Sequence, residues 1–187
     1  MLITPAPHGL DLLVSDLVRS PGLHMSTIYG KLFQELEPKR YRGEIEQANP
    51  LLLALGTAWE RHLEFILGQN GLQVVRPGEL QSADGRIAYS PDGIWEDRLI
   101  EYKLSSMGSK DLPHEPCTKL PPKFDKYVCQ MASYCYHLGT PKARLYFCSI
   151  YRPHDPELVV YDIEFSAREL HDNWRMMSNY AKSKGLL

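Results

Sequence analysis

The sequence SPDG at residues 90–93, followed by IEYK at residues 100–103, is the most informative stretch of this chain. Side chains alternate between the two faces of a strand, so Glu101 and Lys103 are expected to project from the same face. Asp92 is expected at the end of the preceding strand, where a tight hairpin would bring it beside Glu101. The stretch therefore predicts two carboxylates and one ammonium on a single patch.

Two carboxylates and a lysine suit the hydrolysis of a phosphodiester bond. Magnesium prefers carboxylate oxygen and is usually held by one or two carboxylates together with water and substrate phosphate. Such an ion lowers the pKa of a bound water and neutralises charge that develops on the phosphate. A neighbouring ammonium could orient the water and stabilise the transition state. The pattern alone leaves open an ordinary surface Glu–Lys pair preceded by an aspartate in a turn.

The residues around this stretch predict an α/β fold, with a mixed sheet flanked by helices. The clearest helix spans residues 50–69, where apolar residues recur at steps of three and four. Further strands are expected at residues 72–75, 87–90, 99–104, 143–151 and 158–165, and further helices at residues 124–138 and 167–182. Residues 8–36 read as a helix in two pieces, broken at the SPG of residues 20–22.

Three side chains on the predicted helices could support the patch. Glu60 lies at the edge of an apolar helix face, where a carboxylate is costly unless it is paired or bound to a metal. Gln130 and Tyr134 are four residues apart and share one face of their helix. A partly exposed helix glutamate and simple amphipathic packing are the alternatives.

Four short motifs give the chain a resemblance to the PD-(D/E)xK nuclease superfamily, in the branch that contains lambda exonuclease and the RecB-type nuclease domains. They are GTAWE at residues 56–60, SPDG at 90–93, EYK at 101–103 and QMASY at 130–134, in the order of the family. The resemblance implies a restriction-endonuclease-like core, a central mixed β-sheet flanked by helices in the order αβββαβ. It divides the chain into an N-terminal helical extension, residues 1–49, and a nuclease core with a C-terminal helix, residues 50–187.

The resemblance also implies a role for each residue of the site. Asp92 and Glu101 would bind Mg²⁺ or Mn²⁺, with the backbone carbonyl of Tyr102 as a further ligand. Lys103 would position or activate the attacking water. Glu60 would bind a second metal ion or a metal-bound water.

Gln130 and Tyr134 would support this site or contact the nucleic acid. Trp59 stands where many RecB-type members have a histidine before the glutamate, which favours a lambda-like site. No iron–sulfur cluster is expected, because the four cysteines form no CxxC pair and their spacing fits no cluster.

The activity implied is that of an Mg²⁺- or Mn²⁺-dependent deoxyribonuclease, an exonuclease or DNA-end-processing enzyme of the phage or recombination type. A structure-selective or site-specific endonuclease and a non-catalytic DNA-end-binding protein with the same fold are the alternatives. DNA would be the partner. By analogy with lambda-like ring trimers, a homo-oligomer or a recombination or packaging partner is also expected.

The net charge of the chain bears on how it could bind nucleic acid. The formal net charge is −2, so a nucleic-acid enzyme would need a locally basic surface. Two stretches could supply it, the first with Lys39, Arg40 and Arg42 and the second with Lys103, Lys110, Lys119, Lys123 and Lys126. No signal peptide and no apolar run of membrane-spanning length is recognised, so a cytoplasmic location without a membrane partner is expected.

Overall fold

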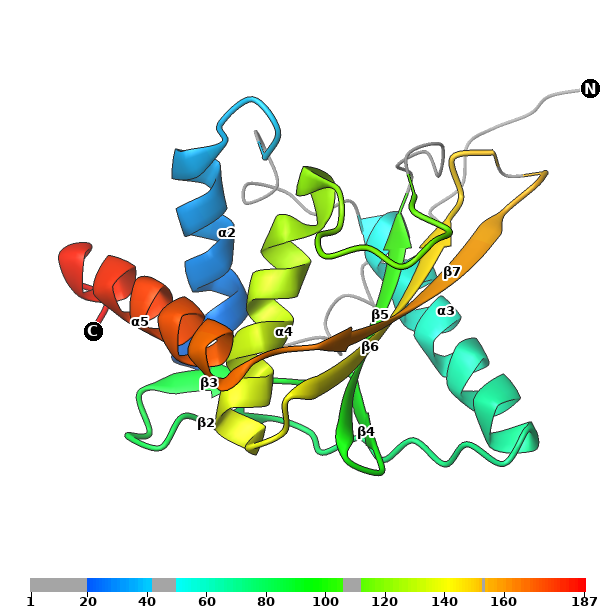
Figure 1. Cartoon of the computed structure of the whole chain (residues 1–187), viewed down its shortest axis with the longest axis horizontal. Helices are drawn as coiled ribbons and strands as arrows, with labels where there is room; N and C mark the ends of the chain where they lie inside the picture. The colour runs from blue at the N-terminus through cyan, green and yellow to red at the C-terminus, as the bar shows by residue number, and fades with distance from the viewer. Residues whose placement is uncertain (1–19, 42–49, 106–111, 153) are drawn as a thin grey trace, which may run out of the picture.

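The computed structural model describes residues 20–41, 50–105, 112–152 and 154–187. These residues form two mixed sheets with helices packed against them (Figure 1), so the predicted α/β class, with mixed sheets flanked by helices, is confirmed. The elements are β1 (Leu23–His24), α2 (Met25–Leu36), α3 (Pro50–Gln69), β2 (Leu80–Gln81), β3 (Ile87–Tyr89), β4 (Gly93–Trp95), β5 (Arg98–Ser105), η1 (Pro122–Phe124), α4 (Asp125–Leu138), β6 (Lys142–Ser149), β7 (Glu157–Glu164) and α5 (Ala167–Ser183).

The larger sheet has the strand order β4-β5-β6-β7. Strands β5 and β6 are parallel, and each pairs antiparallel with its outer neighbour, β4 or β7. Strand β6 is almost wholly buried, in keeping with its apolar sequence. Strand β7 alternates between half-buried and exposed positions, as predicted for an edge strand. The parallel pair therefore forms the centre of a mixed sheet.

The strands before β5 differ from the prediction of one central sheet. Strand β3 belongs to a second sheet of order β1-β3-β2, and residues 72–75 form no strand. Those residues make a single bridge, from Val75 to Ile94. Pro77 has no N–H and Gly78 has a φ of 73°, so the pairing cannot extend further along the chain. Strand β4, which the sequence did not indicate, is the hairpin partner of β5 instead.

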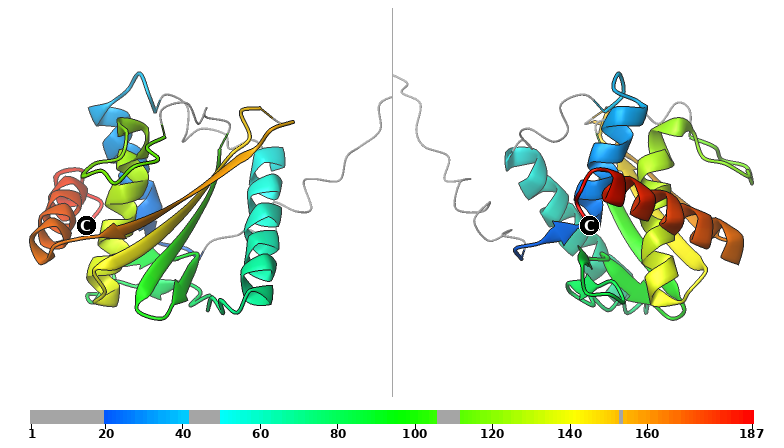
Figure 2. Two further views of the ribbon diagram at one scale, coloured as in Figure 1. Left: turned by 45° about the vertical axis from the view of Figure 1, so that its right-hand side comes forward. Right: turned by 90° about the vertical axis from the view of Figure 1, so that its left-hand side faces the viewer.

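Helices cover both faces of the larger sheet (Figure 2). On one face the main core joins buried residues of α2, α4 and α5 to sheet residues such as Leu99. On the other face α3 packs through a smaller cluster that includes Leu63 and Ile100. Because successive residues of β5 point to opposite faces, Glu101 lies on the face with Leu99, towards α4.

The predicted helices are confirmed with small shifts of their ends. Helix α3 spans Pro50–Gln69, as its periodicity predicted, and α4 ends before Gly139, which has a φ of 68°. Helix α5 begins with a capping box, in which Ser166 and Glu169 each bind the other's backbone N–H. None of the described helices is long and apolar enough to cross a bilayer.

Helix α2 supplies part of the main core. It corresponds to the second helical piece predicted within residues 8–36, whereas the first piece lies outside the described residues. The hydroxyl groups of Tyr29 and Ser133 lie 2.6 Å apart, and Asn173 Nδ2 donates to Tyr29 at 2.8 Å. This buried contact joins α2, α4 and α5, so residues on both sides of the predicted boundary at residue 49 share one core.

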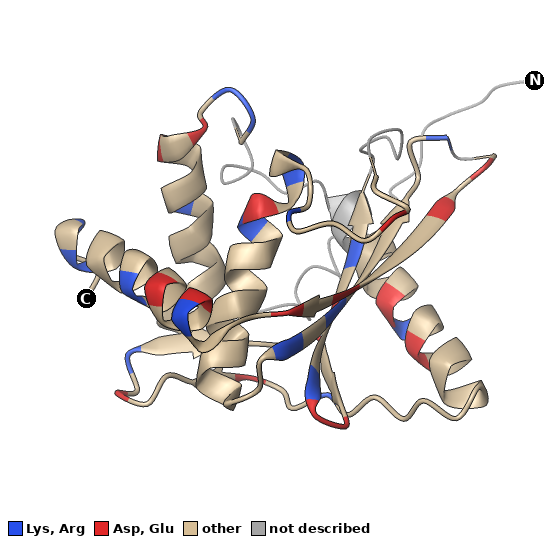
Figure 3. Ribbon diagram, in the orientation of Figure 1, with Lys and Arg blue, Asp and Glu red and all other residues tan. Residues whose placement is uncertain are grey.

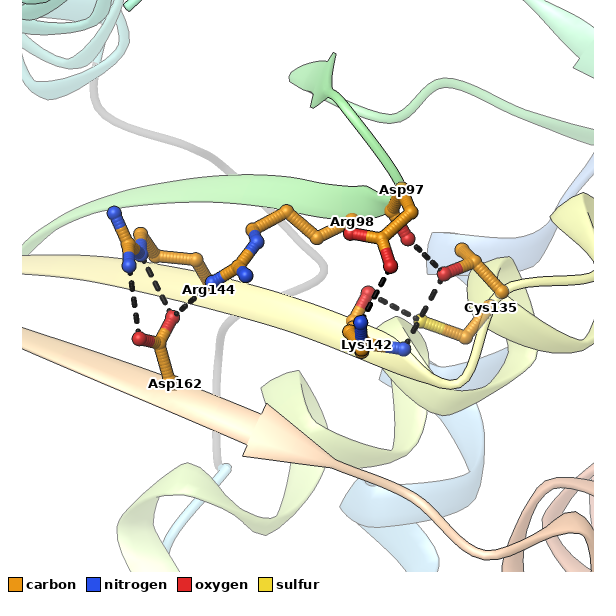
Figure 4. A network of polar contacts seen from close by, with 7 residues as sticks. Asp97, Arg98, Cys135, Lys142, Arg144 and Asp162 are labelled. Atoms are coloured by element: carbon orange, nitrogen blue, oxygen red, sulfur yellow. Dashed lines mark hydrogen bonds and ion pairs between the residues drawn. The ribbon is translucent and has the colours of Figure 1, made fainter.

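Charged side chains tie three strands together on the α3 face of the larger sheet (Figure 4). Arg144 donates to both carboxylate oxygens of Asp162, at 2.7 and 2.8 Å, and Arg98 donates to one of them at 2.9 Å. Both guanidinium carbons lie 5.2 Å from the centroid of the Trp95 ring. From the sequence Trp95 could either stack on a base or pack at its turn, and these contacts favour packing.

Candidate active site

The β4–β5 hairpin positions the three residues predicted to form the site. Gly93 pairs with Ile100, and the strands reverse within two residues, Glu96 and Asp97. Asp92 lies immediately before the paired residues, and its Oδ2 accepts a hydrogen bond from the backbone N–H of Tyr102 at 2.7 Å. A tight hairpin therefore forms, but its first strand is β4 rather than the predicted strand of residues 87–90. Asp92 precedes that strand, and the hairpin fixes its carboxylate next to the backbone of β5.

Lys103 connects the two carboxylates. Its Nζ lies 2.6 Å from Glu101 Oε1 and 3.7 Å from Asp92 Oδ2. The same ammonium donates to the backbone carbonyl of Tyr102 at 2.9 Å. The structure thus brings together Asp92, Glu101, Lys103 and the Tyr102 carbonyl, which the sequence predicted to share one centre.

Burial makes this cluster electrostatically unusual. The side chain of Glu101 is 2% exposed. Desolvation, and then the nearby charge of Asp92, raises the pKa of Glu101 to about 8. Burial opposes the charged form of Lys103, but Glu101 and Asp92 outweigh it and raise the pKa of that ammonium above its ordinary value. Lys103 therefore remains a cation, whereas burial and the charge of Asp92 favour the protonated form of Glu101 in the absence of a further cation.

The cluster has the chemistry of a site for a hard divalent cation. Glu101 Oε2 is buried and has no hydrogen-bond partner among the described residues, so one carboxylate oxygen is left to be satisfied. The described residues contain no group of three or more His, Cys, Asp or Glu that could hold an ion by themselves. Magnesium does not require such a group, because water and substrate phosphate complete its coordination. Two carboxylates and a carbonyl oxygen fit this ion.

Glu60 lies near the cluster without touching it. Burial, followed by the charge of Asp92, raises the pKa of Glu60. Among the described residues, Arg76 is the ion-pair partner of this carboxylate, and its Nη2 lies 3.4 Å from Glu60 Oε2. Arg76 also donates from Nε to Glu64 Oε1 at 2.6 Å. Helix α3 therefore brings Glu60 to the edge of the site, with Arg76 beside it.

Arg76 is a site residue that sequence analysis did not identify. It follows Val75, which exchanges two backbone hydrogen bonds of 2.8 Å with Ile94 of β4. A Cβ atom added to Gly93 would lie 2.2 Å from Val74 Cγ1, so the close approach of this segment requires glycine. Nothing in the local sequence distinguishes Arg76 from a surface arginine, because its position depends on contacts with a distant hairpin.

Gln130 and Tyr134 form a buried pair on α4. Gln130 Nε2 donates to the hydroxyl of Tyr134 at 2.6 Å. The Tyr134 ring is 2% exposed and stacks on Tyr89, with 5.5 Å between the ring centroids. Burial, and then the charge of Glu101, raises the pKa of Tyr134. Of the two roles expected from the sequence, this burial favours support of the site over direct contact with nucleic acid.

Comparisons with known proteins identify the fold. No protein-family model and no curated protein matches the sequence. Among solved structures, LHK-Exo, an alkaline exonuclease from Laribacter hongkongensis, matches with a TM-score of 0.54 and 20% identity over 87% of this chain and 87% of that chain. LHK-Exo in complex with dAMP matches with the same TM-score and coverage, at 18% identity.

A third solved structure, of the protein SSO0001, matches with a TM-score of 0.51 and 16% identity over 92% of this chain and 79% of that chain. Identities this low establish the fold alone. The predicted α/β architecture, with mixed sheet structure flanked by helices, is thereby confirmed as a fold shared with LHK-Exo.

Proposed function

We propose that this protein is a metal-dependent deoxyribonuclease that hydrolyses phosphodiester bonds. The observation that carries the proposal is the convergence of Asp92, Glu101 and Lys103 across the β4–β5 hairpin. One buried carboxylate oxygen of Glu101 has no hydrogen-bond partner in the part of the chain that the structure describes. An ordinary surface Glu–Lys pair would leave its glutamate in water, whereas the Glu101 side chain is 2% exposed. Burying such a group is costly unless a ligand compensates for the lost hydration.

Each residue of the site would have its own role in catalysis. Asp92, Glu101 and the Tyr102 carbonyl would hold Mg²⁺ or Mn²⁺, which supplies charge neutralisation and an acidified water. Lys103 stays protonated, so it would donate a hydrogen bond to the water or the phosphate rather than remove a proton. Glu60 would hold a second ion or a metal-bound water.

The fold favours action at DNA ends. LHK-Exo, whose architecture this chain shares, is an alkaline exonuclease. We therefore propose exonuclease or end-processing activity, with DNA as the substrate. Because one fold can host several activities, the choice between cutting ends, cutting internally and binding without turnover rests on experiment.

Linear and covalently closed circular DNA, incubated with Mg²⁺, with Mn²⁺ and with EDTA, separate these activities. Loss of linear DNA only, with either metal and not with EDTA, is the expected result. Nicked or linearised circles would instead identify an endonuclease. If neither form is cut under any condition, the protein is not a deoxyribonuclease. End-labelled single- and double-stranded substrates would then define the preferred strand.

A further inference from the structure

The ring of Tyr127, on the first turn of α4, lies close to two lysines, one of them in the candidate active site. Lys103 Nζ is 5.6 Å from the centroid of this ring, and Lys126 Nζ is 5.7 Å from it. Lys126 Nζ also lies 5.5 Å from the centroid of the Tyr41 ring. Attraction between a cation and an aromatic face thus places the Lys126 ammonium one side chain away from the catalytic lysine.

The same side of α4 continues towards the buried pair described above. Gln130 follows Lys126 by four residues and Tyr127 by three, and residues with these spacings are neighbours on a helix surface. Lys126 and Tyr127 are both half-buried, whereas Gln130 is buried. A strand of nucleic acid that is bound at the candidate active site and runs along this side of α4 would therefore pass close to Lys126.

Residues 122–127, at the start of α4, include two lysines and one acidic residue. Figure 3 shows basic positions at the start of this helix and on β5, which packs against it. Lys123 lies over the ring of Phe124, 5.7 Å from its centroid. The acidic residue in the first turn, Asp125, is paired with Lys119 at 3.6 Å. The second basic stretch of the sequence therefore adjoins the candidate active site.

From this arrangement we infer that Lys126 binds the phosphodiester backbone next to the scissile phosphate, and that Tyr127 positions Lys126 for that contact. The inference rests on the proposed function, because it names a contact that the same site makes with its substrate. A protein of net charge −2 gains little from long-range attraction to DNA, so local cations must supply the binding. A half-buried ammonium loses less side-chain freedom on binding than a fully solvated one.

Salt dependence of DNA binding tests the inference. The measurement is fluorescence anisotropy of labelled single-stranded and duplex oligonucleotides in EDTA, over a range of KCl concentrations. Cleavage is prevented by Asp92→Asn, which keeps an acceptor for the Tyr102 N–H. Each phosphate contact contributes roughly 0.7 to 0.9 to the slope of log affinity against log salt concentration. Lys126→Gln should therefore lower the slope by about one.

Matched variants separate this contact from a general loss of charge or fold. Lys182→Gln makes the same change at an exposed position in the last turn of α5 and should leave the slope unaltered. Lys126→Arg and Tyr127→Phe should also retain it, whereas Tyr127→Leu should weaken binding. Thermal denaturation of each variant confirms that it is folded.

An unchanged slope in folded Lys126→Gln, or no DNA binding by the parent protein at low salt, would overturn the inference. A different outcome is that the parent protein binds DNA, with the expected smaller salt dependence in Lys126→Gln, and yet cuts no DNA with either metal. That outcome would contradict the proposed nuclease activity instead. That result would leave the DNA contact in place. The two failures are therefore distinguishable.

Discussion

Lys103 shows how much of the candidate site depends on a single side chain. Its ammonium contacts Glu101, Asp92 and the Tyr102 carbonyl from one position. Removing a hydrogen-bond donor aimed at a developing charge typically costs about 10²- to 10³-fold in rate. We expect Lys103→Ala to lower DNA cleavage at least about 10²-fold, while isothermal titration still detects Mn²⁺ binding to the two carboxylates.

Lys142→Ala is the matched control for that variant. Lys142 lies on β6, opposite Arg98, and pairs with Asp97 at the hairpin turn, so its loss should leave cleavage unchanged. Full activity in Lys103→Ala would show that the site has been assigned to the wrong residues.

Glu101 links metal binding to pH. Because its pKa in the folded protein is about 8, against an ordinary value of about 4.3, the folded state holds the proton over a range where the unfolded chain does not. In the absence of metal, this group therefore makes the free energy of unfolding fall as the pH rises from about 4 to 8.

A divalent ion favours the charged carboxylate, so its binding should release a proton below about pH 8. We expect Mn²⁺ to raise the melting temperature more at pH 8.5 than at pH 6.5. Titration calorimetry in two buffers with different ionisation enthalpies should report the released proton. Glu101→Gln should lose both the proton release and most of the metal-dependent shift, and a variant that keeps them would place the ion elsewhere.

The packing of the irregular segment after α3 against the β4–β5 hairpin brings elements of the site together. A Cβ atom at Gly93 would lie 2.2 Å from Val74 Cγ1, next to the bridge between Val75 and Ile94. We expect Gly93→Ala to destabilise the protein by about 1–3 kcal/mol, the usual cost of overpacking. Urea denaturation measures the change in the free energy of unfolding.

Two variants make this prediction specific. Gly68, inside α3, has open space around its Cβ position, so Gly68→Ala should stabilise the helix by up to about 1 kcal/mol. Adding Val74→Ala to Gly93→Ala should recover part of the lost stability, because it removes the colliding atom. Equal effects of the two glycine substitutions would argue against a steric cause.

For the complete chain, the main question is whether residues 50–187 can fold alone. Met25, Ile28 and Tyr29 of α2 are fully buried in the main core. Deleting residues 1–49 would expose the surfaces of α4 and α5 that they cover. We expect the truncated protein to lack a cooperative unfolding transition by circular dichroism. Cooperative unfolding of residues 50–187 would instead support a separate N-terminal extension.

Tyr29→Phe tests the same contact between α2 and the core with a single substitution. It keeps the ring in the core and removes only the hydroxyl shared with Ser133 and Asn173. Leaving those buried groups without this partner should cost about 1–3 kcal/mol, with the cooperative transition retained.

The sequence alone determined most helices and strands and the grouping of Asp92, Glu101 and Lys103. Apolar periodicity is a local property, so it located α3, α4 and α5 to within a residue or two. The three site residues lie on one hairpin, and strand alternation with a tight turn is enough to bring them together. Their roles in catalysis remain predictions.

The tertiary structure alone decided how the strands divide between two sheets, and which distant residues meet at the site. Arg76 reaches Glu60 because a backbone bridge holds its segment against β4. Lys103 and Lys126 both approach the ring of Tyr127. Periodicity reports which face of an element is buried but not which element covers it. Contacts between residues far apart in the chain depend on packing, which no local pattern encodes.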